Sequence, residues 1–261
     1  MKQNRIDELN KSFSGPVFIF ASGASAAEFS LNEYSNIPFI AVNGAVRKFI
    51  DEGIVPLAYV FSDESFISNS VELVEMAIKL CKFIFMPYEL FDKYLSNNSD
   101  LIPYFDKIYF IHKLNRKNGV KQGADWLYYT RKIFDRDLLF DYSLFSSRKN
   151  KIGFSKNIKK GYFCIRTIPY IALQLSYYLG FNRVFLVGMD LTASVGRFYD
   201  RGDALPTTLD KDYPKHIEPG FKFFSQNVIN DDFKVYNLST NSRVSTGIIP
   251  KISLDELAKL I

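Results

Sequence analysis

A chain of 261 residues is long enough for one large α/β domain, or for one domain with a sizeable insertion. The apolar content of 47% is ample for a buried core, and the 16 Tyr residues suggest surfaces that stack on sugars or bases. The net charge of +5 suits an anionic substrate, a nucleotide donor or an anionic membrane surface, and it is too mild to indicate nucleic-acid binding.

The N-terminal segment and the cysteines indicate where the protein works. Residues 1–11 are charged and polar, so we expect no signal peptide. No run of about 20 apolar residues occurs, so we expect no transmembrane helix, and any membrane contact would be peripheral. Cys81 and Cys164 lie in apolar contexts without metal-ligand spacing, which is typical of buried thiols in a reducing cytoplasm. We therefore expect a cytoplasmic protein.

Seven segments rich in Val, Ile, Phe and Tyr predict β-strands. In chain order they are 17–21, 38–42, 57–61, 83–86, 107–111, 183–188 and 234–238. Apolar residues with helical spacing occur between them, at 45–52, at 71–82 and most clearly at 167–179, where Gly180 follows as a C-cap. This alternation predicts a single α/β domain over residues 1–261. Its sheet would be Rossmann-like, mostly parallel and twisted, with helices on both faces.

Polar or glycine residues follow the first three predicted strands. They are Ser22, Gly23, Ser25, Asn43, Ser62 and Asp63. Open α/β sheets bind ligands outside the carboxyl ends of their strands, so these residues predict a nucleotide site. The turn with Gly23 lets backbone amides approach a phosphate, and Asn43 can hydrogen-bond a base or a ribose. Two simpler interpretations stay open: an ordinary turn capped by Ser25, and a turn-forming Asn43-Gly44 pair.

Further ligand candidates lie around the sixth predicted strand. Gly188 and Asp190 follow its end, and a carboxylate at that edge usually faces a ligand hydroxyl or caps the next helix. Thr167 begins the clearest helix, where it can donate to a phosphate while the helix dipole assists. A plain N-cap is the alternative role for Thr167.

Two segments interrupt the alternation of strands and helices. Residues 113–161 predict an inserted helical subdomain with a basic face and interleaved aromatics such as Trp126; a solvated helical cover is the alternative. Its basic residues include Lys113, Arg116, Lys117, Lys121, Arg131, Lys132, Arg148, Lys149, Lys151, Lys156, Lys159 and Lys160. Residues 197–219 look like a long loop, and long loops beside the carboxyl edge of a sheet are often lids.

The sequence contains few residue patterns that are typical of metal sites. It also contains only two histidines, His112 and His216. D-x-D triplets occur at 135–137 and 210–212, but each has a basic middle residue and neither follows a predicted strand, so we expect no metal. His112 closes an apolar run and is expected to be structural. His216 lies in a polar segment of the predicted lid. It is the best available general base, because histidine ordinarily titrates near neutrality, although an exposed loop histidine without a role is the alternative.

Several segments resemble the lipopolysaccharide core Kdo transferases of enteric bacteria, which add a side-branch Kdo sugar to the inner core. They are 18–25, 151–155, 166–175, 187–191, 196–199 and 233–239, so the resemblance spans nearly the whole chain. A more distant similarity is to the bacterial sialyltransferases that use CMP-sialic acid. That family has Gly-Pro-Ser where this chain has Gly23-Ala24-Ser25, and an Asn where this chain has Ser62-Asp63.

The two resemblances imply one chemistry, since Kdo and sialic acid are both 2-keto acid sugars activated as CMP conjugates. They imply a sialyltransferase-like variant of the GT-A fold and inverting transfer from CMP-Kdo to a lipid A-core acceptor. No metal cofactor is implied, because the donor leaves as a nucleoside monophosphate. His216 would be the base, Arg197 and Tyr199 would neutralise the leaving phosphate, and the strand-end residues with Thr167 would hold CMP.

The resemblance also implies which part of the protein binds the acceptor. The basic residues of 113–161 would contact anionic groups of the acceptor and the anionic surface of the inner membrane, on which the protein would be peripheral. Two other functions remain alternatives. One is a CMP-sialic acid-dependent sialyltransferase of the same fold, and the other is a non-catalytic nucleotide- or lipid-binding protein of core assembly.

Overall fold

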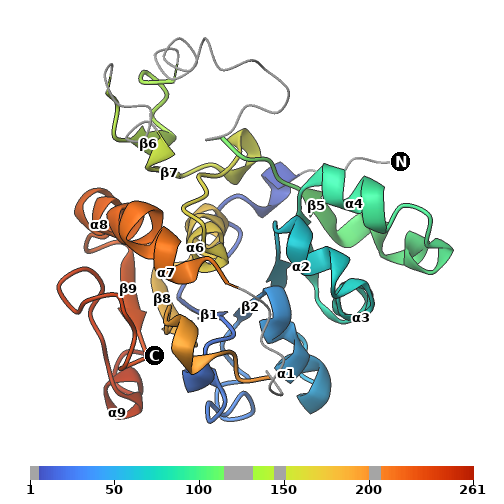
Figure 1. Cartoon of the computed structure of the whole chain (residues 1–261), viewed down its shortest axis with the longest axis horizontal. Coiled ribbons are helices and arrows are strands. Elements are labelled where there is room, and N and C mark those ends of the chain that lie inside the picture. The colour runs from blue at the N-terminus through green and yellow to red at the C-terminus, as the bar shows by residue number, and fades with distance from the viewer. Residues whose placement is uncertain (1–5, 115–131, 144–150, 200–206) are drawn as a thin grey trace.

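The central sheet consists of parallel strands, with β1 in its interior (Figure 1). The computed structural model describes residues 6–114, 132–143, 151–199 and 207–261, and within them the sheet has seven strands in the order β5-β4-β3-β2-β1-β8-β9. The strands are β1 (Pro16–Phe20), β2 (Phe39–Val42), β3 (Ala58–Val60), β4 (Phe83–Met86), β5 (Ile108–Phe110), β8 (Arg183–Val187) and β9 (Lys234–Asn237). Each predicted strand is confirmed to within one residue at either end.

Helices cover both faces of the sheet, because the side chains of each strand alternate between them. Val17 and Ile19 of β1 belong to a core cluster with residues of α6 and α8, whereas Phe18 and Phe20 belong to a cluster with residues of α1 and α3. The helices are α1 (Val46–Glu52), α2 (Glu64–Ser68), α3 (Val71–Leu80), α4 (Tyr88–Tyr94), α6 (Ile168–Leu179), α7 (Leu209–Asp212), α8 (Glu218–Asn227) and α9 (Leu254–Leu257). The predicted α/β fold is confirmed.

The helix that the sequence predicts most clearly, α6, has the expected ends. Thr167 is its N-cap residue, and Gly180 is its C-cap residue with a φ of 100°. That left-handed conformation suits glycine, and the Gly180 N–H donates to the carbonyls of Ser176 and Tyr177 in the last turn. The cap fixes where the chain leaves α6 and enters β8, the strand beside β1.

The described part of the predicted insertion contains an antiparallel pair, β6 (Leu138–Phe140) and β7 (Gly153–Ser155), where the sequence predicts helices. Phe154 of β7 is fully buried, and its ring stacks on Phe224 of α8 at 5.2 Å. This tertiary contact packs the extended segment against α8. Residues 115–131 and 144–150, which carry Arg116, Lys117, Lys121, Trp126, Arg131, Arg148 and Lys149 of the prediction, lie outside the described residues.

A buried glutamine joins this strand pair to α6. The Oε1 atom of Gln174 accepts the N–H groups of Ser155 (3.0 Å) and Phe163 (2.9 Å). Its Nε2 donates to the carbonyls of Phe163 (2.8 Å) and Tyr170 (3.0 Å). Gln174 is fully buried, so one side chain satisfies backbone groups that water does not reach.

The predicted lid segment 197–219 is helical in its second part. There α7 continues into a π-helix, η9 (Tyr213–Ile217), and then into α8. Tyr213 and Ile217 are buried, and the Tyr213 hydroxyl donates to the carbonyl of Arg243 at 2.8 Å. These anchors explain why the segment is ordered as helix rather than as the predicted loop. Among the described residues, no helix has the length and apolar character needed to cross a membrane.

Candidate active site

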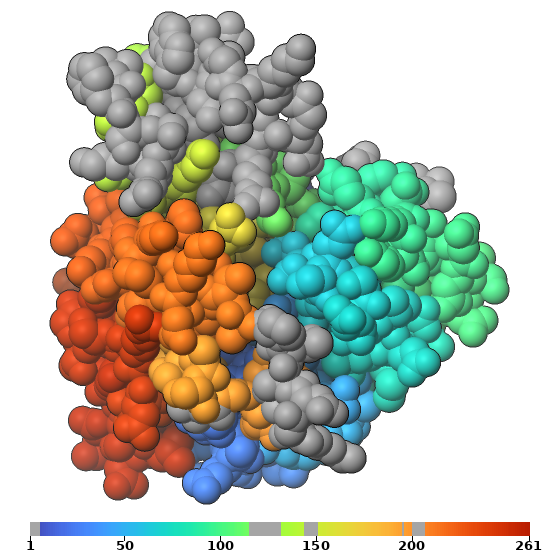
Figure 2. Space-filling view, in the orientation of Figure 1, coloured from blue at the N-terminus to red at the C-terminus, as the bar shows by residue number. Residues whose placement is uncertain are grey.

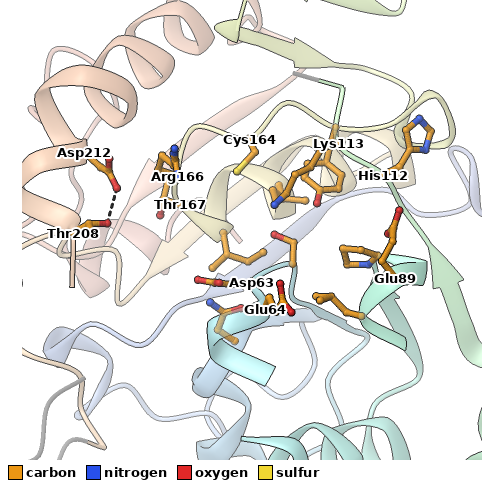
Figure 3. A pocket seen from close by; sticks show the side chains of 17 residues that line it. Asp63, Glu64, Glu89, His112, Lys113, Cys164, Arg166, Thr167, Thr208 and Asp212 are labelled. Carbon is orange, nitrogen blue, oxygen red and sulfur yellow. Dashed lines mark hydrogen bonds between the residues drawn. The ribbon is translucent and has the colours of Figure 1, made fainter. Parts of the chain in front are cut away.

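A cavity of about 640 Å³ lies at the carboxyl edge of the sheet, between the ends of β2 to β5, the start of α6 and the start of α7 (Figure 3). Figure 2 shows the surface recessed between α7, in orange, and α2, in cyan. Four residues that the sequence predicts as nucleotide ligands line this cavity: Asn43, Ser62, Asp63 and Thr167. The strand-end pattern therefore brings these residues to one site, as expected for an open α/β sheet.

Asn43 is held in a conformation unusual for its residue type. Its φ of 45° lies in the left-handed region, and its Oδ1 atom is buried without a hydrogen-bond partner among the described residues. A Cβ atom on the next residue, Gly44, would lie 2.1 Å from the Tyr199 hydroxyl, so a larger residue there would displace the Tyr199 ring. A buried acceptor without a partner is costly, and a ligand that donates to Asn43 would remove the cost.

Thr167 stands where α6 begins, and its hydroxyl makes no capping hydrogen bond. Its backbone is extended, with φ −142° and ψ 135°. The plain N-cap interpretation is therefore not what the geometry favours. The hydroxyl and the positive end of the 12-residue α6 together favour an anionic group at this side of the cavity.

The strand ends at β1 and β8 form a closed polar network next to the cavity. The backbone N–H and hydroxyl of Ser25 both donate to the Asp190 carboxylate, the former at 2.9 Å, and the Ser25 Oγ lies 2.8 Å from the Ser239 Oγ. Gly23 N–H donates to the carbonyl of Gly188 at 2.8 Å. Asp190 is 5% exposed, and these residues are not part of the cavity wall. Their predicted contact with a nucleotide stays a prediction, while their contacts with one another fix the central strands.

Arg197 and Tyr199 lie over the end of β1. Arg197 pairs with Gly23 in an antiparallel bridge, and Phe198 N–H donates to the carbonyl of Ser22 at 3.0 Å. The guanidinium of Arg47 lies 5.6 Å from the centre of the Tyr199 ring. The 197–199 segment thus covers the first predicted turn, and neither Arg197 nor Tyr199 lines the cavity.

The carboxylates of the cavity wall already have partners. Asp63 caps α2 by accepting the N–H of Ser65 at 3.0 Å. Glu64 pairs with Lys93 at 2.6 Å, and the hydrogen bond from Lys93 lowers the pKa of Glu64. The Thr208 hydroxyl donates to Asp212 at 2.6 Å, as the dashed line in Figure 3 shows.

The two histidines occupy different positions relative to the cavity. His112 lines the cavity, but in Figure 3 its ring points away from the Lys113 amine. Desolvation lowers the pKa of His112, and a hydrogen bond to the backbone of Lys160 opposes that shift. The structural role predicted for His112 stays a prediction. His216 lies in η9, four residues after the cavity residue Asp212, and it does not line the cavity itself.

Neither D-x-D triplet presents a pair of open carboxylates. The Lys160 amine lies 2.7 Å from Asp135 and 2.8 Å from Asp137. Arg243 pairs with Asp210 at 2.7 Å. Over the described ranges, no group of three or more His, Cys, Asp and Glu residues is arranged to hold a metal ion.

Sequence reasoning missed part of the cavity wall. Glu89 follows β4 and Arg166 precedes α6, whereas Lys113, which follows β5, was predicted on the basic face of 113–161 that meets the acceptor and not in the wall of this cavity. The strand-end rule that selected residues after the first three strands applies equally after β4 and β5, so it was a usable signal for Glu89 and Lys113. Arg166 adopts a φ of 70°, and no local pattern in the sequence predicts that conformation.

Comparison with known proteins assigns the family. The model of the family described as 3-deoxy-D-manno-octulosonic acid transferase WaaZ matches residues 1–255. The chain belongs to this Kdo transferase family. Two curated relatives carry the name "Probable 3-deoxy-manno-octulosonic acid transferase". The relative from Escherichia coli K12 is 28% identical, and the match covers 96% of this chain and 87% of the relative. The relative from Salmonella typhimurium LT2 is 30% identical, and the match covers 92% of this chain and 87% of the relative.

A solved glycosyltransferase shares the fold of this Kdo transferase family member, and a second solved structure matches it at a lower TM-score. The MAf glycosyltransferase of Magnetospirillum magneticum AMB-1 matches with a TM-score of 0.50 and 12% identity, over 96% of this chain and 37% of that longer one. The Campylobacter jejuni sialyltransferase CstII, solved with cytidine-5'-monophosphate, matches with a TM-score of 0.42 and 16% identity, over 90% of this chain and 83% of its own. The resemblance to Kdo transferases stated from the sequence is confirmed.

Proposed function

We propose that this protein transfers Kdo from CMP-Kdo to the inner core of lipopolysaccharide, as an inverting, metal-independent glycosyltransferase. The proposal rests on one observation. This protein belongs to the Kdo transferase family, and its cavity at the carboxyl edge of the sheet has Asn43 and Thr167 in the wall. The buried oxygen of Asn43, which has no hydrogen-bond partner in the described part of the chain, suits an amino or hydroxyl donor of a nucleoside. The start of α6 suits the single phosphate of a CMP sugar.

In this proposal the acceptor hydroxyl loses its proton to His216 and attacks the anomeric carbon of Kdo, and CMP departs on the opposite side. One in-line displacement inverts the configuration. Two features support His216: it lies one helical turn beyond Asp212, and π-helical turns such as η9 occur frequently at functional sites. In the same proposal Arg197 and Tyr199, which lie over the β1 turn and not in the cavity wall, would assist in stabilising the leaving phosphate. A departing monophosphate requires no metal to clamp a diphosphate.

The donor preference is tested by measuring CMP release from CMP-Kdo and from CMP-sialic acid, each with and without EDTA. We expect release from CMP-Kdo with the lipid A-core acceptor, little release from CMP-sialic acid, and no loss of rate with EDTA. Release from CMP-sialic acid alone would favour the sialyltransferase. Binding of CMP without release from either donor would favour the non-catalytic binding protein. A strict requirement for a divalent ion would contradict the metal-independent mechanism.

We further propose that the protein works at the cytoplasmic face of the inner membrane, with its basic segment toward the lipid. Lys151 and Lys159 are exposed there, and Phe134 is 89% exposed on the same segment. Each basic residue near an anionic surface contributes about 1 kcal/mol, within a Debye length. Binding to anionic vesicles should therefore weaken steeply as salt is added.

The double variant Lys151→Glu/Lys159→Glu should bind anionic vesicles more weakly than the wild type in a sedimentation assay at low salt. The matched control is Lys79→Glu/Lys259→Glu, which makes the same change in net charge at exposed residues of other elements. Equal losses in both variants would indicate a general charge effect, and no vesicle binding at low salt would contradict the membrane proposal.

A further inference from the structure

Two cations of the cavity wall, Lys113 and Arg166, have no ion pair or side-chain hydrogen bond with any residue that the structure describes. Figure 3 shows the Lys113 amine extending into the cavity, with Arg166 on the other side of Cys164. Lys113 is half-buried, so its charge is only partly screened by water. The cavity therefore offers two separate positive charges to a ligand.

Among the described residues, none of the wall carboxylates Asp63, Glu64, Glu89 and Asp212 forms an ion pair with these cations. Asp63 is engaged by the first turn of α2, Glu64 by Lys93, and Asp212 by Thr208. Arg166 also holds a left-handed φ of 70°, a conformation that costs roughly 1–3 kcal/mol in a residue other than glycine. Two cations without partners, one on a strained backbone, fit a ligand that carries two anionic groups.

The positions of the cations indicate which group each one meets. Arg166 directly precedes Thr167 and the start of α6, where the helix dipole favours a phosphate. Lys113 follows β5, the edge strand three places from β2, whose end carries Asn43. A nucleoside at Asn43 and a phosphate at α6 leave the β4–β5 side of the cavity for the sugar.

We propose that Lys113 forms the subsite for the carboxylate of the sugar acid, while Arg166 and Thr167 hold the phosphate. The proposal rests on the proposed function and extends it, because it names the residue that distinguishes a 2-keto acid sugar from a neutral one. A lysine amine supplies three donors and a point charge, which match a carboxylate. Lys113 is thus a specificity residue for the donor.

The test is to measure Kd values for CMP-Kdo and for CMP by calorimetry, in the wild type and in Lys113→Gln. We expect the variant to bind CMP-Kdo about 10- to 100-fold more weakly, the range for losing one hydrogen bond between charged groups, and to bind CMP within about twofold of the wild type. Lys113→Arg should recover part of the loss. Arg166→Gln should weaken both ligands, and Lys259→Gln, an exposed lysine near the C-terminus, should change neither.

Steady-state kinetics adds a second readout. The KM for CMP-Kdo should rise in Lys113→Gln, while the KM for the acceptor stays unchanged. An unchanged Kd for CMP-Kdo, an equal loss for CMP and CMP-Kdo, or a rise only in the acceptor KM would each overturn the subsite. Failure of the proposed function would look different, since the wild type itself would then release no CMP from CMP-Kdo.

Discussion

Replacing His216 with alanine is expected to lower kcat by about 100-fold or more, the scale of a lost general base, while the Kd for CMP stays close to that of the wild type. The physical reason is that an unassisted acceptor hydroxyl is a poor nucleophile at neutral pH. CMP binding should persist, because His216 lies in η9 and does not line the cavity that contains Asn43 and Thr167. Turnover with CMP-Kdo and calorimetry with CMP measure the two effects separately.

His112→Ala is the matched control, because it removes the other imidazole of the chain from a position that does line the cavity. The sequence predicts a structural role for His112, so we expect turnover within a few-fold of the wild type. If His112→Ala loses activity and His216→Ala retains it, the base is His112 and the proposed role of the η9 segment is wrong.

Gln174→Leu is expected to lower the free energy of unfolding by roughly 3 kcal/mol or more, because each buried polar group left without a partner costs about 1–3 kcal/mol. The N–H groups of Ser155 and Phe163 and the carbonyl of Phe163 lose their partner, and leucine offers none. Urea denaturation followed by circular dichroism measures the change.

The control for this variant is Gln226→Leu, at an exposed position of α8, which should alter the free energy of unfolding by less than about 0.5 kcal/mol. If Gln174→Leu is as stable as the wild type, the strand pair β6–β7 does not depend on this side chain. The activity of the variant is measured alongside its stability, to report whether the site still assembles.

Local sequence signals were enough to locate the strands and part of the site. Runs of Val, Ile and Phe predict the strands, and the rule that ligands bind outside strand ends brings Asn43, Ser62 and Asp63 together. Thr167 joins them because the helical spacing of the apolar residues at 167–179 places it at the start of α6. These predictions succeed because each depends on a few neighbouring residues.

Long-range contacts determine the features that the sequence did not reveal. The network of Ser25, Asp190 and Ser239 joins the ends of three strands that are far apart in the chain. The extended conformation of β7 depends on Phe224 and Gln174. No spacing rule in the sequence identifies such partners, because they meet only after the sheet has formed.

The most direct test of the central claim is the mass of the acceptor after incubation of the purified protein with CMP-Kdo and lipid A-core. The proposed function predicts that the acceptor gains the mass of one Kdo residue while an equal amount of CMP appears. The His216→Ala variant is the negative control, and its acceptor should gain little or no mass in the same time. An unchanged acceptor mass with CMP-Kdo left intact would contradict the account.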